Sequence, residues 1–182
     1  MKMFKRFAAA LLAGVMVLAM LTACGGGAPK SLAQRTEDVV LGMLNYTVQN
    51  GENLSADGEL TNDSGLYETL QEVLSHVNTE NDTVDAKYIP QTVFGKMENN
   101  TQNVVSYNIV DGNGKVRIVT EADVAQMEDA LKKANDAAAQ QQLKIKAIKY
   151  NKIAVAARTI EGKTYMVTAM DATYTYGEPA VE

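Results

Sequence analysis

Apolar residues recur at the three- and four-residue spacing of an amphipathic helix in three stretches of the chain. This spacing predicts helices over about residues 31–49, 64–77 and 120–138. The dipeptide Asn50-Gly51 is a typical stop after the first helix, and a capping box at residues 120–123 would open the third. The predicted apolar faces consist of Val40, Met43 and Leu44 in the first helix, Leu66, Leu70, Val73, Leu74 and Val77 in the second, and Val124, Met127, Leu131, Ala134 and Ala138 in the third.

A first β-hairpin is predicted between the second and third helices. Residues 104–110 and 116–120 are rich in the β-branched side chains that strands favour. They flank the turn sequence Asp111-Gly112-Asn113-Gly114, whose residues adopt a positive φ at low cost. The irregular segment before this hairpin contains four apolar residues that we expect to dock it on the core: Tyr88, Ile89, Val93 and Phe94.

The clearest strand pattern lies near the end of the chain. Residues 152–160 and 163–171 flank Glu161-Gly162, and both predicted strands carry small or apolar side chains on both faces. A strand that is apolar on both faces is usually covered on both. We therefore expect this hairpin at the centre of a sheet, with helices on at least one side.

The order helix, helix, hairpin, helix, hairpin is typical of an α+β domain. We predict one domain over residues 36–176, in which three main helices pack on an antiparallel sheet. Residues 177–182 are expected to form a loose tail. Tyr174 and Tyr176 precede this tail, where they would either form a contact surface for carbohydrate or peptide or pack on an edge strand.

The first 24 residues have the pattern of an export signal. Lys2, Lys5 and Arg6 precede an uncharged apolar run, residues 7–21, which is too short for a comfortable transmembrane span. The run ends in Leu21-Thr22-Ala23-Cys24, which resembles the lipobox of bacterial lipoproteins. An ordinary signal peptide with a chance cysteine is the alternative interpretation.

The lipobox resemblance implies that the signal peptide, residues 1–23, is removed and that Cys24 carries the lipid. Two or three acyl chains give a stable anchor. Residues 24–35 would then be a linker that keeps the domain near the membrane surface. The resemblance therefore implies a lipid-anchored protein that faces the extracytoplasmic side.

Charge and cysteine content exclude some classes of ligand and site. The signal peptide holds three of the 17 basic residues and none of the 22 acidic ones, so the rest of the chain has a net charge of −8 (14 against 22). An acidic chain without a basic cluster is a poor ligand for nucleic acid. Cys24 is the only cysteine, which excludes an internal disulfide and a thiolate metal site.

Short segments at Leu44-Asn45, Asn50-Gly51 and Ser75-His76, and the pair 149–156 and 162–167, resemble the CAP superfamily of cysteine-rich secretory and pathogenesis-related proteins. The resemblance implies an α-β-α sandwich with a ligand groove, and it makes His76 a candidate groove residue. The family pattern is incomplete, however, because residues 132–148 contain no histidine and no Gly-His-Arg. A CAP-like domain in this chain would therefore lack an intact metal site.

Candidate chemistry is sparse. His76 is the only histidine, so a His-rich zinc site cannot form, and no Ser-His-Asp set stands out. A metal site from His76, Glu80 and Asp82 stays open, against the alternative that His76 is an ordinary half-buried or surface residue. We predict no cofactor and no metal.

These observations predict a membrane-anchored lipoprotein whose domain binds an envelope protein or peptide without catalysis. Two alternatives stay open: a divergent CAP-like domain with a ligand groove, and a hydrolase that uses carboxylates alone. A groove with two facing carboxylates would favour the hydrolase. A flat or apolar surface patch would favour the binding domain.

Overall fold

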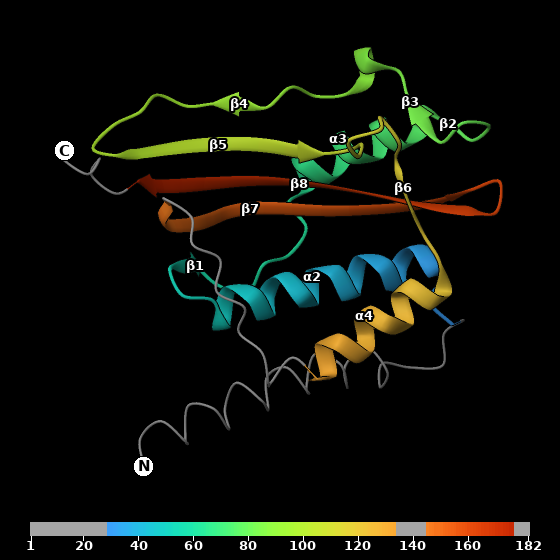
Figure 1. Cartoon of the computed structure of the whole chain (residues 1–182), viewed down its shortest axis with the longest axis horizontal. Helices are drawn as coiled ribbons and strands as arrows, with labels where there is room; N and C mark the ends of the chain where they lie inside the picture. Colours follow the sequence, from blue (N-terminus) through green and yellow to red (C-terminus); the bar gives the residue numbers. More distant parts are fainter. Residues whose placement is uncertain (1–28, 134–144, 177–182) are drawn as a thin grey trace.

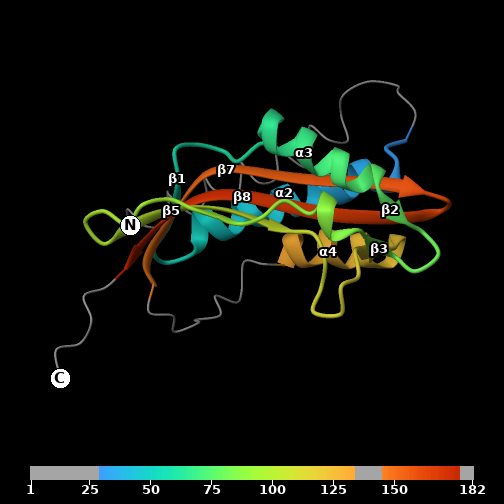
Figure 2. The same cartoon turned by 90° about the horizontal axis from the view of Figure 1, so that it is seen from above.

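The structure, a computed structural model, describes residues 29–133 and 145–176. A sheet forms its middle layer, with α3 on one face and α2 and α4 on the other side (Figures 1 and 2). The elements in chain order are α2 (Leu32–Asn50), β1 (Leu54–Ala56), α3 (Ser64–Ser75), β2 (Val77–Asn78), β3 (Thr83–Val84), a 3-10 turn (Ala86–Tyr88), β4 (Val93–Phe94), β5 (Thr101–Asn108), β6 (Arg117–Val119), α4 (Glu121–Lys133), β7 (Ile145–Ile160) and β8 (Lys163–Tyr176).

The main sheet has six strands in the order β1-β7-β8-β5-β4, and β6 also pairs with β8. All of its strand pairs are antiparallel except β1 with β7, which run parallel. The predicted α+β class with helices packed on a sheet is confirmed. The sheet is mixed rather than purely antiparallel, because the short strand after α2 runs in the same direction as β7.

The predicted C-terminal hairpin is confirmed as the centre of the sheet. Glu161 and Gly162 both have a positive φ, 49° and 79°, as a tight two-residue turn between twisted strands requires. The strands are longer than expected and begin and end beyond residues 152 and 171. The pairing of β7 with β8 shifts its register between Tyr150 and Lys152, so Asn151 is an extra residue in β7.

The predicted first hairpin is only partly correct. The turn forms, because Gly114 donates its backbone N–H to the carbonyl of Asp111 at 3.0 Å. The two arms meet only at one isolated antiparallel bridge, between Val110 and Val116, and β5 and β6 both pair with β8 instead of with each other. Asn108 lies opposite Thr168 of β8, and Arg117 lies opposite Met166 of the same strand. Residues 109–116 therefore leave the main sheet between β5 and β6, and we call this segment the 109–116 excursion.

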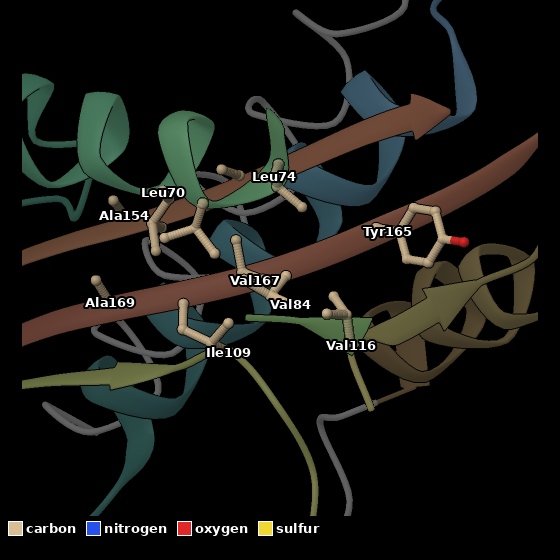
Figure 3. Close-up of a cluster of buried hydrophobic side chains, with 11 residues drawn as sticks. Leu70, Leu74, Val84, Ile109, Val116, Ala154, Tyr165, Val167 and Ala169 are labelled. Carbon is tan, nitrogen blue, oxygen red and sulfur yellow. The ribbon is translucent and has the colours of Figure 1, made fainter. Parts of the chain in front are cut away.

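Helix α3 covers one face of the sheet (Figures 2 and 3). Leu70 and Leu74 are fully buried and belong to one cluster with Ala154, Val167 and the ring of Tyr165. The small side chains along β7 let the helix come close to the strands. This face holds the larger of the two buried clusters.

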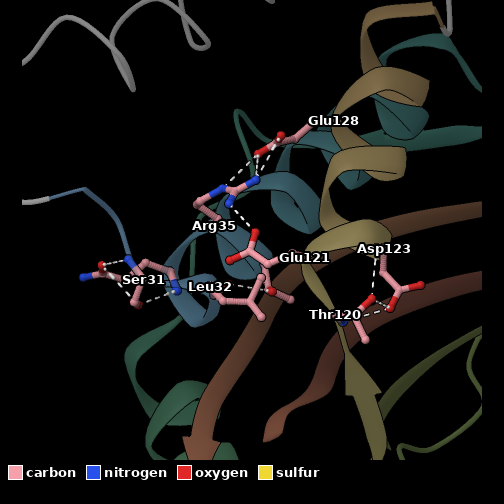
Figure 4. A network of polar contacts seen from close by, with 9 residues as sticks. Ser31, Leu32, Arg35, Thr120, Glu121, Asp123 and Glu128 are labelled. Atoms are coloured by element: carbon pink, nitrogen blue, oxygen red, sulfur yellow. Dashed lines mark hydrogen bonds and ion pairs between the residues drawn. The ribbon is translucent and has the colours of Figure 1, made fainter. Parts of the chain in front are cut away.

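Helices α2 and α4 cover the other side, where Val39 and Val124 pack against Val155 and Met166. Figure 4 shows how Arg35 of α2 joins α4 by ion pairs to Glu121 at 2.6 Å and to Glu128 at 3.3 Å. A capping box at Ser31 starts α2, so the folded domain begins before residue 36. Helices therefore cover both sides of the central hairpin.

Candidate functional site

One surface hollow lies between the 109–116 excursion and β8, and has a volume of about 630 Å³. We call it the β8 groove. Met166, Val167 and Thr168 of β8 are among the residues that line it. The polar side chains that line it are Asp82, Asn108, Asp111, Lys115, Arg117 and Thr168.

The two carboxylates of the β8 groove are engaged by the fold itself. Asp82 accepts hydrogen bonds from Lys163 Nζ and from the Tyr165 hydroxyl, each at 2.7 Å, and these hold the pKa of the Asp82 carboxyl below its ordinary value. Asp111 accepts the backbone N–H groups of Lys115 and Asn113 at 3.0 and 2.8 Å, which likewise lower its pKa. Both groups are therefore ionised at neutral pH and serve as anchors for loops.

Carboxylate-only hydrolysis needs one acid that stays protonated beside one that is ionised. Neither carboxylate of the β8 groove is suited to the protonated role. The carboxyl whose pKa is raised is Glu37, because burial outweighs the hydrogen bonds that it accepts. Glu37 lies on α2 at the edge of β7 and does not line the β8 groove. The hydrolase alternative gains no support from this arrangement.

A smaller hollow of about 300 Å³ lies between residues 56–63 and β7. Lys152 and Asp63 form an ion pair at 3.2 Å within it. Tyr150 also lines it, and burial raises the pKa of the Tyr150 hydroxyl. The ion pair joins the segment of residues 56–63 to β7, so this hollow is part of the attachment of that segment to the sheet.

His76 is a structural residue at the end of α3 and lines neither hollow. Its ring stacks on that of Tyr88, with the centroids 3.6 Å apart and the planes 4° from parallel. Its Nε2 lies 3.0 Å from Glu72 Oε1. The imidazole is thus packed on the 3-10 turn, and the expected role of His76 as a groove residue stays a prediction. Within residues 29–133 and 145–176, no three potential ligands gather into a metal site.

Tyr174 and Tyr176 belong to β8, which lies between β7 and β5. The choice between a contact surface and packing on an edge strand stays a prediction. Both side chains are partly exposed. The strand runs further than its period-2 pattern indicated, which carries both tyrosines into the sheet.

The most prominent surface feature is an apolar patch at strand β4, which we call the β4 patch. It consists of Val93, Phe94 and Met97, whose side chains are 58%, 67% and 50% exposed. The only other large apolar side chain of the described residues with comparable exposure is Ile118, at 37%. Three exposed apolar side chains within five residues make a continuous stretch of chain that lacks cover.

The expectation that Val93 and Phe94 dock on the core is therefore wrong. Tyr88 and Ile89 do pack against the buried cluster under α3. Strand β4 is the last strand of the sheet and pairs with β5 over two residues, whereas α3 packs on β7 and β8. Figure 1 shows β4 on the outer side of β5, away from β7 and β8, on which α3 packs.

Sequence reasoning missed this patch because apolar composition alone does not say whether a segment is covered. Pro90 precedes the exposed stretch, and proline within a sheet is typical of edge strands. That proline was the available signal.

The predicted signal peptide and Cys24 lie outside the described residues. None of the helices in the described parts of the chain is both long and apolar enough to cross a bilayer. Comparison of the chain with protein-family models, with curated proteins and with solved structures finds no match.

Proposed function

We propose that this protein is a lipid-anchored extracytoplasmic lipoprotein whose domain binds a protein partner through the β4 patch. The observation that carries the proposal is the exposure of Val93 and Phe94 on an edge strand, and of Met97 shortly after it. Exposed apolar stretches of this kind are typical of interaction sites. The lipobox-like sequence at Cys24 supports the anchoring.

An edge strand offers a partner two kinds of contact at once. Its outer backbone groups can pair with an added strand, and its side chains supply apolar area on both sides of the new ladder. Val93 lies opposite Val105 and Phe94 opposite Val104 in the β4–β5 ladder, so the two side chains point to opposite faces of the sheet. A partner strand at this edge would cover both of them.

The binding half of the proposal is tested with tagged full-length chains cross-linked in intact cells. We expect a cross-linked complex in the wild type that is lost in Phe94→Glu. The matched control is Ile118→Glu, which places the same charge at another exposed apolar position of the sheet and should keep the complex. Equal amounts of complex in all three chains would refute the role of the β4 patch.

The anchoring half is tested separately with Cys24→Ala. The variant should lose its lipid and leave the membrane fraction, because the acyl chains supply most of the membrane affinity. Ser31→Ala serves as a control that alters the start of α2 and leaves Cys24 in place. Acylation of the Cys24→Ala chain would refute the lipobox assignment without touching the β4 patch.

A small-molecule ligand in the β8 groove is a second candidate function. The observation that favours it is the position of Arg117 among apolar lining residues such as Ile109 and Ile118, which suits an amphipathic ligand with an anionic group. Thermal-shift screening of anionic ligands tests it, with Arg117→Gln expected to abolish any stabilisation.

A further inference from the structure

We infer that the occupant of the β4 patch is a second copy of this chain, paired antiparallel through β4 about a two-fold axis. This inference rests on the proposed role of the patch as an interaction surface and goes further by naming the partner. It follows from the direction of the backbone groups, the register that they allow and the charge along the edge.

The backbone of Phe94 faces the open side of β4. Gly95 donates its N–H to the carbonyl of Asn103 on β5 at 2.7 Å, so Gly95 points toward the sheet. Alternate residues of an antiparallel strand turn their N–H and C=O groups to opposite sides. Phe94 therefore directs both of its backbone groups away from β5, toward any strand added at the edge.

A two-fold axis at Phe94 satisfies these groups with the same residue of the second copy. Each Phe94 would donate its N–H to the carbonyl of the other, and the two rings would lie opposite each other as a cross-strand aromatic pair. Val93 would then lie opposite Gly95 of the second copy. Because glycine has no side chain, the branched side chain of Val93 meets no steric obstacle there.

Charge also favours this edge as the contact between copies. Without the predicted signal peptide the chain has a net charge of −8, so two copies repel over most of their surfaces. Residues 91–95 carry no charge, and the proposed register places Lys96 opposite Thr92. No like charges face each other across the axis in this register.

The contact is small, well below the roughly 1,200 Å² of total buried surface that stable interfaces need. Pairing therefore depends on a high local concentration of the chain. Confinement of both copies to one membrane supplies this, as tethering does for any weak interaction. We expect pairs in the membrane and monomers in dilute solution.

The test places the photo-reactive residue p-benzoylphenylalanine at position 94, which keeps an aromatic ring at the proposed axis. Two versions of the full chain with different tags are produced in the same cells and irradiated. The control carries the same residue in place of Ile118, an exposed position outside the edge. Circular dichroism of each purified chain establishes that it is folded.

A product that carries both tags from position 94, absent from position 118, is the expected result. A product that joins one tagged chain to a different protein would overturn the second copy as the occupant and would leave the proposed function standing. The absence of any protein product from a folded chain would overturn both.

A second measurement tests the register. With the photo-reactive residue at Thr92, the added change Phe94→Glu should lower the doubly tagged product by about tenfold, since it removes the aromatic pair and sets two carboxylates face to face. The change Gln91→Glu, placed opposite Met97 in this register, should lower it much less. Equal losses from the two changes would overturn the axis at Phe94.

Discussion

The carboxylate of Glu37 on α2 accepts a hydrogen bond from the hydroxyl of Tyr67 on α3, with 3.0 Å between the two oxygens. Because these helices lie on opposite sides of the sheet, the contact joins the outer layers around the edge of β7. The same oxygen of Glu37 accepts the backbone N–H of Ala157 at 2.8 Å, and Asn62 accepts that of Val155 at 2.7 Å. Side-chain oxygens thus accept hydrogen bonds from the backbone N–H groups of β7 beyond its pairing with β1. Within the described residues, no such side-chain hydrogen bonds are found along the open edge of β4.

The first prediction concerns the charge of Glu37. Burial raises the pKa of its carboxyl above the ordinary 4.5, so the folded chain holds a proton that the unfolded chain has already lost. Stability should therefore fall as the pH rises through the window that begins at 4.5. Glu37→Gln keeps an acceptor oxygen without the charge. It should be at least as stable as the wild type near neutral pH, with the difference shrinking toward acid pH in urea titrations.

Glu37→Ala is the control for this prediction. It removes the acceptor and leaves the Tyr67 hydroxyl and the Ala157 N–H without their partner, at a cost of about 1–3 kcal/mol in unfolding free energy. If the Gln and Ala variants were equally unstable near neutral pH, the acceptor role of Glu37 would be refuted.

The second prediction concerns Tyr165, whose fully buried ring places its hydroxyl 2.7 Å from Asp82. Tyr165→Phe should lower the unfolding free energy by about 1 kcal/mol near neutral pH, because one hydrogen bond is lost. Burial also raises the pKa of the Tyr165 hydroxyl to about 12, against 10.0 for an ordinary tyrosine. The wild type should therefore lose stability between these values as the pH rises, and the gap to the variant should narrow.

Asp82→Asn tests the other partner of the hydrogen bond between Tyr165 and Asp82. Asp82 has a φ of 58°, a conformation that asparagine tolerates well, so the substitution keeps the backbone. The lowered pKa of Asp82 means that its carboxylate stabilises the fold above its ordinary pKa and stops doing so as the pH falls through the folded value. Asp82→Asn should flatten the acid side of the stability profile. An unchanged profile would show that the Lys163 and Tyr165 contacts do not stabilise the ionised form.

Elements with local signals could be predicted from the sequence. The three helices have apolar stripes and capping residues, and the β7–β8 hairpin has a two-residue turn between strands that are apolar on both faces. The partners of β5 and β6 could not be predicted in this way. The turn at residues 111–114 reverses the chain, but the choice of β8 over a mutual ladder depends on a strand that comes much later in the sequence.

The candidate site was less predictable than the fold, for the same reason. Whether Phe94 is covered depends on where α3 lies over the sheet, and no pattern around residue 94 contains that information. The charged residues of the β8 groove come from two separate segments, one at Asp82 and one at residues 111–117. The location of the protein rests on the local pattern that ends at Cys24, and it stays a prediction.

The third prediction concerns His76, whose ring stacks on Tyr88. His76→Ala should lower the unfolding free energy by about 0.5–1.5 kcal/mol, since the aromatic pair is lost. His76→Phe keeps a ring at this position and should restore most of that difference. Cross-linking from position 94 should survive both changes. Its loss from a chain of normal stability would give His76 a role in binding that the geometry does not indicate.

The last prediction concerns the turn of the central hairpin, where Gly162 has a φ of 79°. An L-residue is strained in this conformation, so Gly162→Ala should lower the unfolding free energy by about 1 kcal/mol. No atom lies within 4 Å of the position of an added Cβ, so the cost is one of backbone conformation alone.

Gly112 is the matched control: it also lies in an exposed turn with open space around it, but its φ is not positive. Gly112→Ala should change stability by less than about 0.5 kcal/mol in the same denaturant titration. Similar losses at both glycines would mean that the 161–162 turn is not held in the left-handed conformation.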